Sequence, residues 1–369
     1  MSIGGAERVA ATMANAWVAQ NKQVWLVLTY LPSRTAEFEL HPAVRIEYLR
    51  ERVTSHDHRW LPTSLRKVIA LRSLIRDIRP DAVVSFLTNV NLLAVLALRG
   101  TNTPIALSER TDPAGDIELP HWMRIARLCL YRFADALVVQ TDTAAQRYQE
   151  RLRRVPEIKV IPNPLPSGLA DSAVRADQTK QGGLIISLGR LTPSKRFDLL
   201  IRAFKEASGE CLGWRLEIWG EGPLRDRLER LVQSLGLTES VRLCGPTREP
   251  WTVLASGQVF ALSSDYEGFP NAMLEAMSVG LACIAFDCPS GPRDLSAGGS
   301  AAIIVSLGDQ SQFARELHVL MADSARRTAL GAAAADVVRR RYSEGDVMSR
   351  WNALLKAIID RRLPDVGAW

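Results

Sequence analysis

Seven residues separate the glutamates Glu267 and Glu275, and the first four of them are Gly-Phe-Pro-Asn. The apolar run over residues 259–262 is typical of a buried strand, and residues 263–268 of a turn. Pro270 suits the first turn of a helix, where the missing N–H of proline costs nothing. We therefore expect Glu267 at a helix tip and Glu275 inside the helix, about 8 Å along at about 1.5 Å per residue.

The tip of this predicted helix offers hydrogen-bond donors. The backbone N–H groups of residues 268–271 are expected to be unpaired there, at the positive end of the helix dipole. Donors flanked by two carboxylates suit a ligand that has an anionic centre with hydroxyl groups on either side of it. A sugar nucleotide is such a ligand. The predicted donor-binding residues of this segment are Gly268, Phe269, Pro270, Asn271, Leu274 and Glu275.

The segment from Glu267 to Glu275 resembles the E-x7-E motif of retaining glycosyltransferases of the GT-B architecture, in particular those of family 4. Residues 189–198, Gly-Arg-Leu-Thr-Pro-Ser-Lys-Arg-Phe-Asp, resemble the family's diphosphate-binding G-R-x-x-x-x-K segment. The N-terminal glycine turn, the interdomain segment and two further segments are also similar to the family: residues 3–9, 160–164, 220–223 and 288–293. These segments cover nearly the whole chain, and their order and spacing together are specific.

Arg190 and Lys195 are the predicted phosphate contacts. In transfer from a nucleotide sugar, negative charge grows on the leaving diphosphate, so positioned cations and N–H donors accelerate the step. Arginine offers a planar fork and lysine a movable point charge, and their spacing suits two phosphates. The N–H groups of Gly4 and Gly5, which open a predicted helix, would add donors from the other domain. A solvated helix start is the alternative for the two cations.

The resemblance also implies roles for the two glutamates. Glu275 is expected to accept hydrogen bonds from the nucleotide ribose, and Glu267 to contact the donor sugar near its 3- and 4-hydroxyls. Retention is attributed to front-face attack, in which the departing phosphate takes the acceptor's proton; the predicted catalytic residues are Arg190, Lys195 and Glu267. A glycosidase-like carboxylate pair fits less well, because a diphosphate leaves without a general acid. Two exposed glutamates on a helix are the remaining interpretation.

The acceptor side is predicted from the segment Ser108-Glu109-Arg110-Thr111-Asp112-Pro113. Many relatives place a catalytic histidine after the fourth or fifth strand of the first domain, and this chain has none in the segment. Glu109 and Arg110 are the candidates for that position, and the departure resembles a subgroup that acts on lipid-linked or capsular saccharides. His121 follows nearby and is expected to be structural.

No metal site is predicted. His56 and His58 flank Asp57 in a polar segment, but the sequence supplies no further ligands that would complete a site there. The chain also contains no Asp-x-Asp sequence, which the metal-dependent glycosyltransferase architecture uses. Because arginine and lysine can neutralise a diphosphate, we expect no metal and no cofactor, with a UDP-sugar as co-substrate.

The composition describes an ordinary globular protein, in which 47% of the 369 residues are apolar and 23% are charged. No apolar run reaches the roughly 18 residues that span a bilayer. No signal peptide is visible, since the N-terminus lacks a basic segment followed by an apolar one. The five cysteines form no C-x-x-C pair, which favours a reducing, cytosolic setting.

The excess of positive charge lies in the first half. Residues 1–165 hold 22 Lys and Arg against 16 Asp and Glu, whereas residues 166–369 hold 24 of each. The expected partner is an anionic membrane surface or a pyrophosphate-linked lipid; nucleic acid is disfavoured because no recognised module is present. The candidate contact is the predicted helix 63–79, although a core helix with a basic solvent face fits almost as well. Its cations are Arg66, Lys67, Arg72, Arg76 and Arg79.

Strands and helices alternate along both halves, which implies parallel sheets covered on both faces. With the resemblance, this predicts an α/β fold of two doubly wound, Rossmann-like domains that face each other across a cleft. The expected domains are residues 1–164, with a crossing C-terminal helix within 346–369, and residues 183–345. Residues 165–182 are the predicted linker.

The first domain is predicted to lack its first strand. Only Met1-Ser2-Ile3 precede the glycine turn, which in doubly wound domains follows the central strand. A missing central strand would leave two unpaired edges in the core. We therefore expect a start upstream of Met1.

The predicted function is a retaining, metal-independent transfer of a hexose or N-acetylhexosamine from a UDP-sugar to a saccharide acceptor. Residues 288–293 and 108–110 are similar to bacterial enzymes that build polyprenyl-diphosphate-linked glycans or exopolysaccharide, which implies a cytoplasmic enzyme on the inner face of the membrane. The rivals are a UDP-sugar 2-epimerase of the same architecture and a nucleotide-sugar binding protein without catalysis. A dehydrogenase is disfavoured, because Arg225 occupies the third glycine position of the fingerprint-like segment 219–225.

Overall fold

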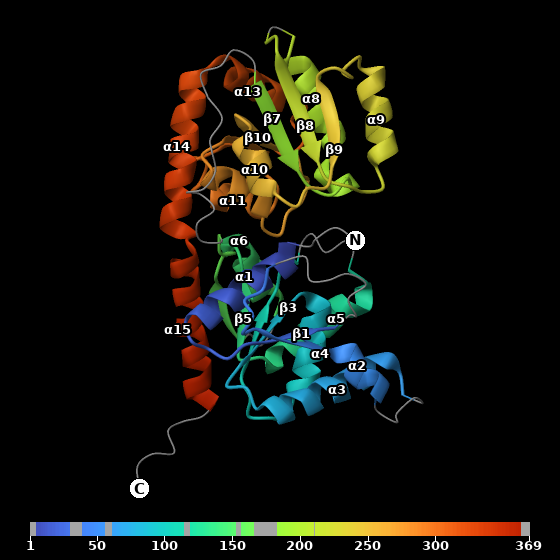
Figure 1. The fold of residues 1–369 in the computed structure, drawn as a ribbon, viewed down its shortest axis with the longest axis vertical. Helices are drawn as coiled ribbons and strands as arrows, with labels where there is room; N and C mark the ends of the chain where they lie inside the picture. Colours follow the sequence, from blue (N-terminus) through green and yellow to red (C-terminus); the bar gives the residue numbers. More distant parts are fainter. Residues whose placement is uncertain are drawn as a thin grey trace. The chain divides into compact units, whose positions relative to one another are not determined.

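The computed structural model describes residues 5–29, 39–55, 61–113, 119–152, 156–165, 183–209 and 211–362 (Figure 1). The chain divides into two compact units. The N-terminal unit comprises Ile3–Pro164 and Glu344–Trp369, and the C-terminal unit contains Leu165–Ser343. Residues 166–182 of the predicted linker lie outside the described residues, as do Gly4 and the His56–His58 segment.

The C-terminal unit is built on a parallel sheet of six strands in the order β12-β11-β10-β7-β8-β9. Their bounds are β7 (Gly183–Leu188), β8 (Trp214–Trp219), β9 (Val241–Gly245), β10 (Val259–Leu262), β11 (Ala282–Phe286) and β12 (Ile303–Val305). Within this sheet the chain enters at the central strand β7 and adds β8 and β9 on one side of it. It then crosses to the other side of β7, where it adds β10, β11 and β12. This is the doubly wound order, and the point where the direction reverses lies between β7 and β10.

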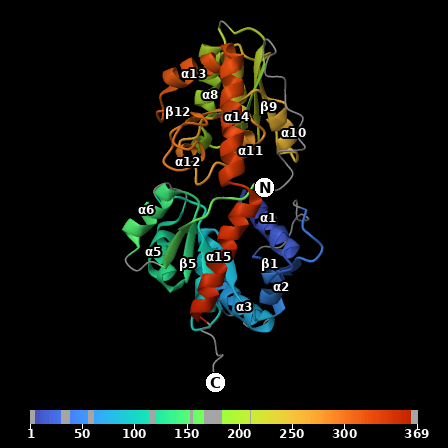
Figure 2. The same cartoon turned by 90° about the vertical axis from the view of Figure 1, so that its left-hand side faces the viewer.

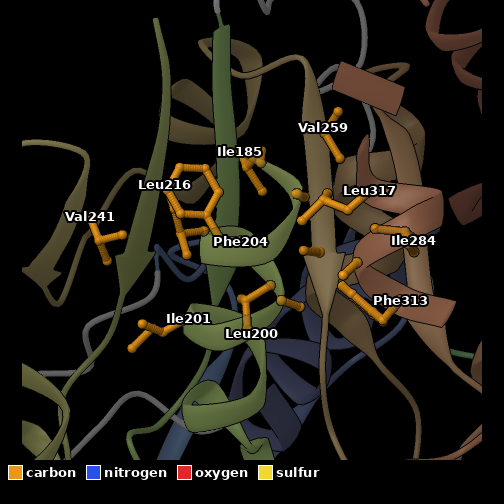
Figure 3. Close-up of a cluster of buried hydrophobic side chains, with 14 of the residues drawn as sticks. Ile185, Leu200, Ile201, Phe204, Leu216, Val241, Val259, Ile284, Phe313 and Leu317 are labelled. Atoms are coloured by element: carbon orange, nitrogen blue, oxygen red, sulfur yellow. The ribbon is translucent and has the colours of Figure 1, made fainter. Parts of the chain in front are cut away.

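Helices cover both faces of this sheet. They are η3 (Pro193–Lys195), α8 (Phe197–Ala207), α9 (Arg225–Ser234), α10 (Pro250–Ala255), α11 (Asn271–Ser278), α12 (Pro292–Leu295), α13 (Gln310–Ala322) and α14 (Ser324–Arg341). Successive side chains of a strand point to opposite faces, so Ile185 packs with Phe204 of α8 (Figure 3), whereas Ile186 packs in the core beneath α11 and α14. Both faces are therefore buried, as the apolar runs of the strands predict.

The described strands of the N-terminal unit form two separate parallel sheets. One pairs β1 (Trp25–Leu28) with β2 (Arg45–Tyr48). The other has the order β3-β4-β5-β6, with β3 (Val83–Phe86), β4 (Ile105–Ser108), β5 (Ala136–Val139) and β6 (Glu157–Val160). The first described element is a helix, and no described strand joins β1 to β3. The lack of a first strand stays a prediction, since residues 1–4 lie outside the described residues.

Helices cover both faces of the four-stranded sheet. They are α1 (Gly5–Ala19), α2 (Leu49–Ser55), α3 (Thr63–Ile78), α4 (Thr88–Leu98), α5 (His121–Leu130), η2 (Tyr131–Phe133), α6 (Asp142–Arg151) and α15 (Glu344–Arg362). One face carries α1 and α15, which pack side by side on Ala136 and Val138 (Figure 2). The opposite face carries α3, α4 and α5, packed over Leu107 and Leu137.

Candidate functional site

The loops that follow β7 and β10 meet at the reversal point of the C-terminal unit's sheet. In doubly wound folds, loops that leave such a point in opposite directions open a crevice at the carboxyl ends of the strands. The loop after β7 carries Arg190 and Lys195, and the loop after β10 carries Glu267. The structure thus brings the predicted lysine and glutamate together from positions 72 residues apart in the sequence.

Lys195 and Glu267 form an ion pair, with Lys195 Nζ donating to Glu267 Oε1 at 2.5 Å. Ser264 Oγ donates to the same oxygen at 2.6 Å. Glu267 is buried and Lys195 is mostly buried, so solvent screens the pair less than it would at the surface. Among the described residues, Oε2 of Glu267 has no hydrogen-bond donor, which leaves that oxygen available to a ligand.

The loop that carries Lys195 is held in shape by contacts that sequence reasoning missed. Arg196 adopts a left-handed backbone conformation (φ 47°), which is uncommon for a residue other than glycine. Its Nη1 donates to both carboxylate oxygens of Asp265, at 3.0 and 2.9 Å, and these hydrogen bonds raise the pKa of Arg196. Asp265 N also donates to Ser194 O at 2.9 Å. The two loops are therefore tied together on either side of the Lys195–Glu267 pair.

Gly220 and Gly222 allow a second turn to approach the Arg190 loop. A Cβ at Gly220 would lie 1.9 Å from Gly189 O, and one at Gly222 would lie 2.6 Å from Leu191 O. The two backbones are joined by hydrogen bonds from Gly189 N to Trp219 O and from Leu191 N to Glu221 O, both 3.0 Å. Close backbone approach thus explains the glycines of the fingerprint-like segment, without a dinucleotide.

Arg190 lies exposed on the supported loop. Within the described part of the chain, its guanidinium makes no hydrogen bond or ion pair. Of the two predicted phosphate contacts, Arg190 therefore has its full donor set available, whereas Lys195 is already paired with Glu267. A planar guanidinium with free donors can bind two oxygens of one phosphate.

The helix tip differs from the prediction in two respects. Helix α11 begins at Asn271 with Pro270 as its N-cap, one residue later than expected. The N–H of Asn271 is not free, because it donates to Phe269 O at 2.9 Å around Pro270 (φ −79°, ψ 79°), which is an inverse γ-turn. Pro270 has no N–H, so the free donors among residues 268–271 are the N–H groups of Gly268 and Phe269, neither of which bonds to any described residue.

The segment after β11 supports this tip. Gly291 has φ 106°, and a Cβ there would lie 2.3 Å from Pro270 Cδ. Ser290 Oγ donates to Gly268 O at 3.3 Å. Burial raises the pKa of the neighbouring Cys288 thiol to about 12, so this cysteine stays protonated and unreactive near neutral pH.

The remaining predicted donor-binding residues of α11 are buried. Glu275 lies inside the helix, as expected, and has a partner within the protein. Leu274 packs in the hydrophobic core, and Phe269 lies 6.1 Å from Tyr342 between ring centroids. Gly5 is the first residue of α1 in the N-terminal unit, where its N–H has no intrahelical partner. Contacts of these residues with a donor stay predictions.

Glu109 is fully buried in the N-terminal unit rather than open to an acceptor. Its two oxygens accept from Thr88 Oγ1 at 3.0 and 2.9 Å, from Tyr131 OH at 2.5 Å and from Thr111 Oγ1 at 3.1 Å. Arg110 N also donates to Oε1 at 3.0 Å. Burial and the Glu109 charge raise the pKa of Tyr131 well above its ordinary value. Glu109 therefore holds the loop after β4 in place.

Arg110 is half-buried, and its guanidinium carbon lies 4.8 Å from the centre of the Phe86 ring. Its Nη1 donates to Asn163 Oδ1, while its buried Nε has no partner among the described residues. Burial lowers the pKa of Arg110 to about 9, against the opposing effect of Glu109. Of the two predicted acceptor-side residues, Arg110 is the one with donor capacity left over.

The described residues contain no group of three His, Cys, Asp or Glu side chains that could hold a metal ion. None of the helices described in the structure combines the length and the apolar character needed to cross a membrane.

Two protein-family models match the chain. The model described as Glycosyltransferase Family 4 matches residues 3–167, and the model described as Glycosyl transferases group 1 matches residues 173–337. Together they cover the predicted glycine turn, both loops of the reversal point and the helix that carries Glu275.

The chain is also similar to individual proteins. It is 29% identical over 299 residues to "Exopolysaccharide phosphotransferase SCO2592" of Streptomyces coelicolor, covering 80% of this chain but 30% of that protein. It is 25% identical to "GalNAc-alpha-(1->4)-GalNAc-alpha-(1->3)-diNAcBac-PP-undecaprenol alpha-1,4-N-acetyl-D-galactosaminyltransferase" of Campylobacter jejuni, over 88% of this chain and 87% of the relative. Among solved structures, Anabaena Alr3699/HepE in complex with UDP and glucose superposes with a TM-score of 0.77 at 16% identity, covering 96% of each chain.

Proposed function

Because the chain belongs to glycosyltransferase family 4 and has the GT-B fold of two Rossmann-like domains, we propose that it is a retaining enzyme that transfers a hexose or N-acetylhexosamine from a UDP-sugar to a saccharide acceptor. The observation that supports this most directly is the Lys195–Glu267 pair at the reversal point, with the free Arg190 guanidinium on the same loop. Such a site combines cations for a diphosphate with a carboxylate oxygen for sugar hydroxyls.

The proposed donor complex combines groups that have no partner among the described residues with two, Lys195 and Glu275, that already have partners within the protein. Arg190 binds the diphosphate bidentately, and Lys195 turns from Glu267 towards it as charge develops. The N–H groups of Gly268 and Phe269 add donors next to the same loop. Glu267 Oε2 accepts hydrogen bonds from the sugar, and Glu275 from the ribose. Because these cations neutralise the diphosphate, the proposed reaction needs no metal.

The proposed reaction proceeds on one face of the sugar. The bond between the anomeric carbon and the diphosphate oxygen breaks, and a bond from the acceptor hydroxyl forms on the same face. The acceptor's proton passes to the departing phosphate oxygen, so no protein carboxylate has to act as an acid or a nucleophile. The fixed cations stabilise the transition state, because the diphosphate gains negative charge as it leaves.

The proposed acceptor is a polyprenyl-diphosphate-linked glycan or an exopolysaccharide precursor. This proposal is supported by the names of the two relatives, one an exopolysaccharide enzyme and the other named for an undecaprenol-linked glycan. A substrate of this kind places the enzyme in the cytoplasm, peripherally on the inner face of the membrane. The excess positive charge of residues 1–165 supports an anionic surface as a partner.

The test is to incubate the protein with labelled UDP-sugars, with and without a polyprenyl-diphosphate-linked saccharide, in the presence of EDTA. We expect UDP release that depends on the acceptor and a product whose anomeric configuration matches the donor's by NMR. An isomerised donor without acceptor would instead identify a 2-epimerase, and donor binding with neither product a binding protein. Loss of turnover with EDTA would contradict the metal-independent step.

A further inference from the structure

Helix α5 presents apolar side chains to solvent and turns a charged one into the protein. The exposed fractions of Trp122, Ile125 and Leu128 are 62%, 51% and 43%, whereas Arg127 is only 2% exposed. The guanidinium carbon of Arg127 lies 5.3 Å from the centre of the Tyr148 ring. Helix α5 is thus apolar on the side that faces solvent, and one of its arginines is buried.

The exposed apolar residues form one continuous stripe. At 3.6 residues per turn, positions 122, 125, 128 and 129 lie on one side of a helix, and each of these side chains is exposed. His121, expected to be structural, is exposed on the same side. The opposite side, with Met123, Ala126 and Leu130, packs on the core of the N-terminal unit. The stripe contains no Asp, Glu, Lys or Arg.

The helix layer that carries this stripe is strongly cationic. Within α3, α4, α5 and η2 and their C-cap residues, the sequence has nine arginines and lysines but one carboxylate, Asp77. That carboxylate is paired with Arg52 Nη1 at 2.7 Å. Arg99 and Arg132 are exposed near the C-terminal end of α5, and their guanidinium carbons lie 4.4 and 4.7 Å from the centre of the Phe133 ring. Apolar and cationic groups are therefore neighbours on one layer.

We propose that the outer face of α5 docks on an anionic phospholipid surface, with Trp122, Ile125 and Leu128 inserted among the headgroups and Arg99 and Arg132 contacting lipid phosphates. Charge complementarity favours this occupant, because an apolar stripe beside Arg99 and Arg132, which form no ion pair with any described residue, matches a bilayer with anionic headgroups. Tryptophan is also the residue that favours the interface between headgroups and acyl chains. The proposal rests on the proposed function only in that a lipid-linked acceptor requires the enzyme at a membrane.

This assignment shifts the contact from α3, the helix favoured by the sequence pattern. Three of the five α3 cations are engaged within the protein: Arg66 Nη2 donates to Val53 O at 2.6 Å, Arg72 Nη1 donates to Arg99 O at 3.0 Å, and Lys67 also has a partner. The apolar side of α3 is buried at Leu71, Leu74 and Ile75. Helix α3 therefore contributes mainly charge to the layer, with Leu65 as its exposed large apolar side chain, whereas α5 presents three such side chains.

Vesicle co-sedimentation of the full chain tests the proposal. We expect binding to vesicles of phosphatidylcholine and phosphatidylglycerol in equal parts, and much weaker binding to phosphatidylcholine alone. The double variant Trp122→Ser/Ile125→Ser should lower partitioning at least about tenfold, and Arg99→Gln/Arg132→Gln should lower it about fivefold per charge. The matched control is Leu212→Ser/Leu307→Ser, which removes side chains 87% and 46% exposed in the C-terminal unit and should bind like the parent chain.

A fluorophore on the exposed Cys129 gives a second readout, since its emission should shift to the blue when the stripe enters the lipid. Equal binding of all variants would overturn the proposal. So would lipid-free self-association that Trp122→Ser/Ile125→Ser abolishes, because the stripe would then be an interface between copies. An assay of sugar transfer to a water-soluble acceptor tests the proposed function separately from membrane binding. The stripe variants should transfer sugar to this acceptor as the parent chain does. If the parent chain transfers no sugar, the proposed function fails, but the result of the vesicle experiment still stands.

Discussion

The two oxygens of the Glu267 carboxylate differ in their contacts. Oε1 is occupied by Lys195 and Ser264, whereas Oε2 has no donor among the described residues. Lys195 is thus held by a partner that would compete with a phosphate for it. Among the described residues Arg190 has no such partner, so the two cations should differ in what they contribute to binding and to turnover.

Removing either cation should slow transfer while affecting the fold differently. Arg190→Ala and Lys195→Ala should each lower turnover on the order of 10²–10³-fold, because each removes a cation that stabilises the negative charge of the leaving diphosphate. Arg190→Ala should leave the melting temperature unchanged, whereas Lys195→Ala leaves Glu267 buried without its cation and should lower it. Steady-state kinetics and thermal melts give both readouts. Arg202→Ala, an exposed arginine of α8, is the control, and near-normal turnover of both site variants would contradict the assignment.

Two buried thiols should make the stability of the protein depend on pH in the alkaline range. Burial raises the pKa of Cys283 and Cys288 above the ordinary value of 9.0. Above about pH 9 the thiols ionise in the unfolded chain but not in the native one, so the native state holds more protons and the free energy of unfolding falls as pH rises. The slope is at most about 1.4 kcal/mol per pH unit for each thiol.

Urea unfolding between pH 8 and pH 10 measures this slope. The variant Cys283→Ala/Cys288→Ala should flatten it, whereas Cys129→Ala, at an exposed position, should leave it unchanged. An identical slope in the parent chain and in the double variant would show that other groups control the alkaline stability.

The γ-turn before α11 lies in the loop after β10, but it depends on Gly291 in the loop after β11. Gly291→Ala should push Pro270 away, because the new Cβ would lie 2.3 Å from Pro270 Cδ. Gly236→Ala is a matched control: it also has a positive φ (68°), with nothing within 4 Å of the added Cβ. Both variants bear the cost of a positive φ, so any difference between them reports the clash. We expect Gly291→Ala to weaken UDP binding on the order of tenfold by calorimetry, at about 1.4 kcal/mol per factor of ten. Equal affinities would show that the tip does not bind the nucleotide.

The parts of the site that could be predicted are those that the order of the strands determines. Strands β7 and β10 could be predicted from their apolar runs, because strands of a parallel sheet are buried on both faces. Since these two strands are neighbours, the loops that follow them bring Lys195 close to Glu267. The inverse γ-turn at Asn271 was not predictable, because it depends on Gly291 packing against Pro270. The burial of Arg127 in α5 likewise depends on Tyr148 of α6, a contact that the pattern of α5 alone does not contain. The hydrogen bonds that bury Glu109, a predicted acceptor-side residue, were not predictable either, because two of its four donors, Thr88 and Tyr131, lie more than 20 residues away in sequence.

The last described helix of the chain completes the core of the N-terminal unit, since α15 belongs to that unit although it follows the C-terminal one in sequence. Trp351 is fully buried there and meets Trp17 edge to face, with ring centroids 6.3 Å apart. Trp17 Nε1 donates to Asn352 Oδ1 at 3.0 Å, and Arg361 Nη2 pairs with Glu157 Oε2 at 2.5 Å. One face of the four-stranded sheet is therefore covered by segments from both ends of the described chain.

Trp351→Ala should consequently destabilise one unit and spare the other. Replacing a buried tryptophan by alanine costs about 3–5 kcal/mol, and the resulting cavity would lie between α1, α15 and the sheet. Hydrogen exchange followed by mass spectrometry should show faster exchange in peptides from α1, β4 and β5, with β7, β8 and β10 unchanged. Lys356→Ala, on the exposed side of the same helix, should change neither set. If both units lost protection from hydrogen exchange equally, they would unfold as one cooperative body. That result would contradict the prediction that each unit has its own core.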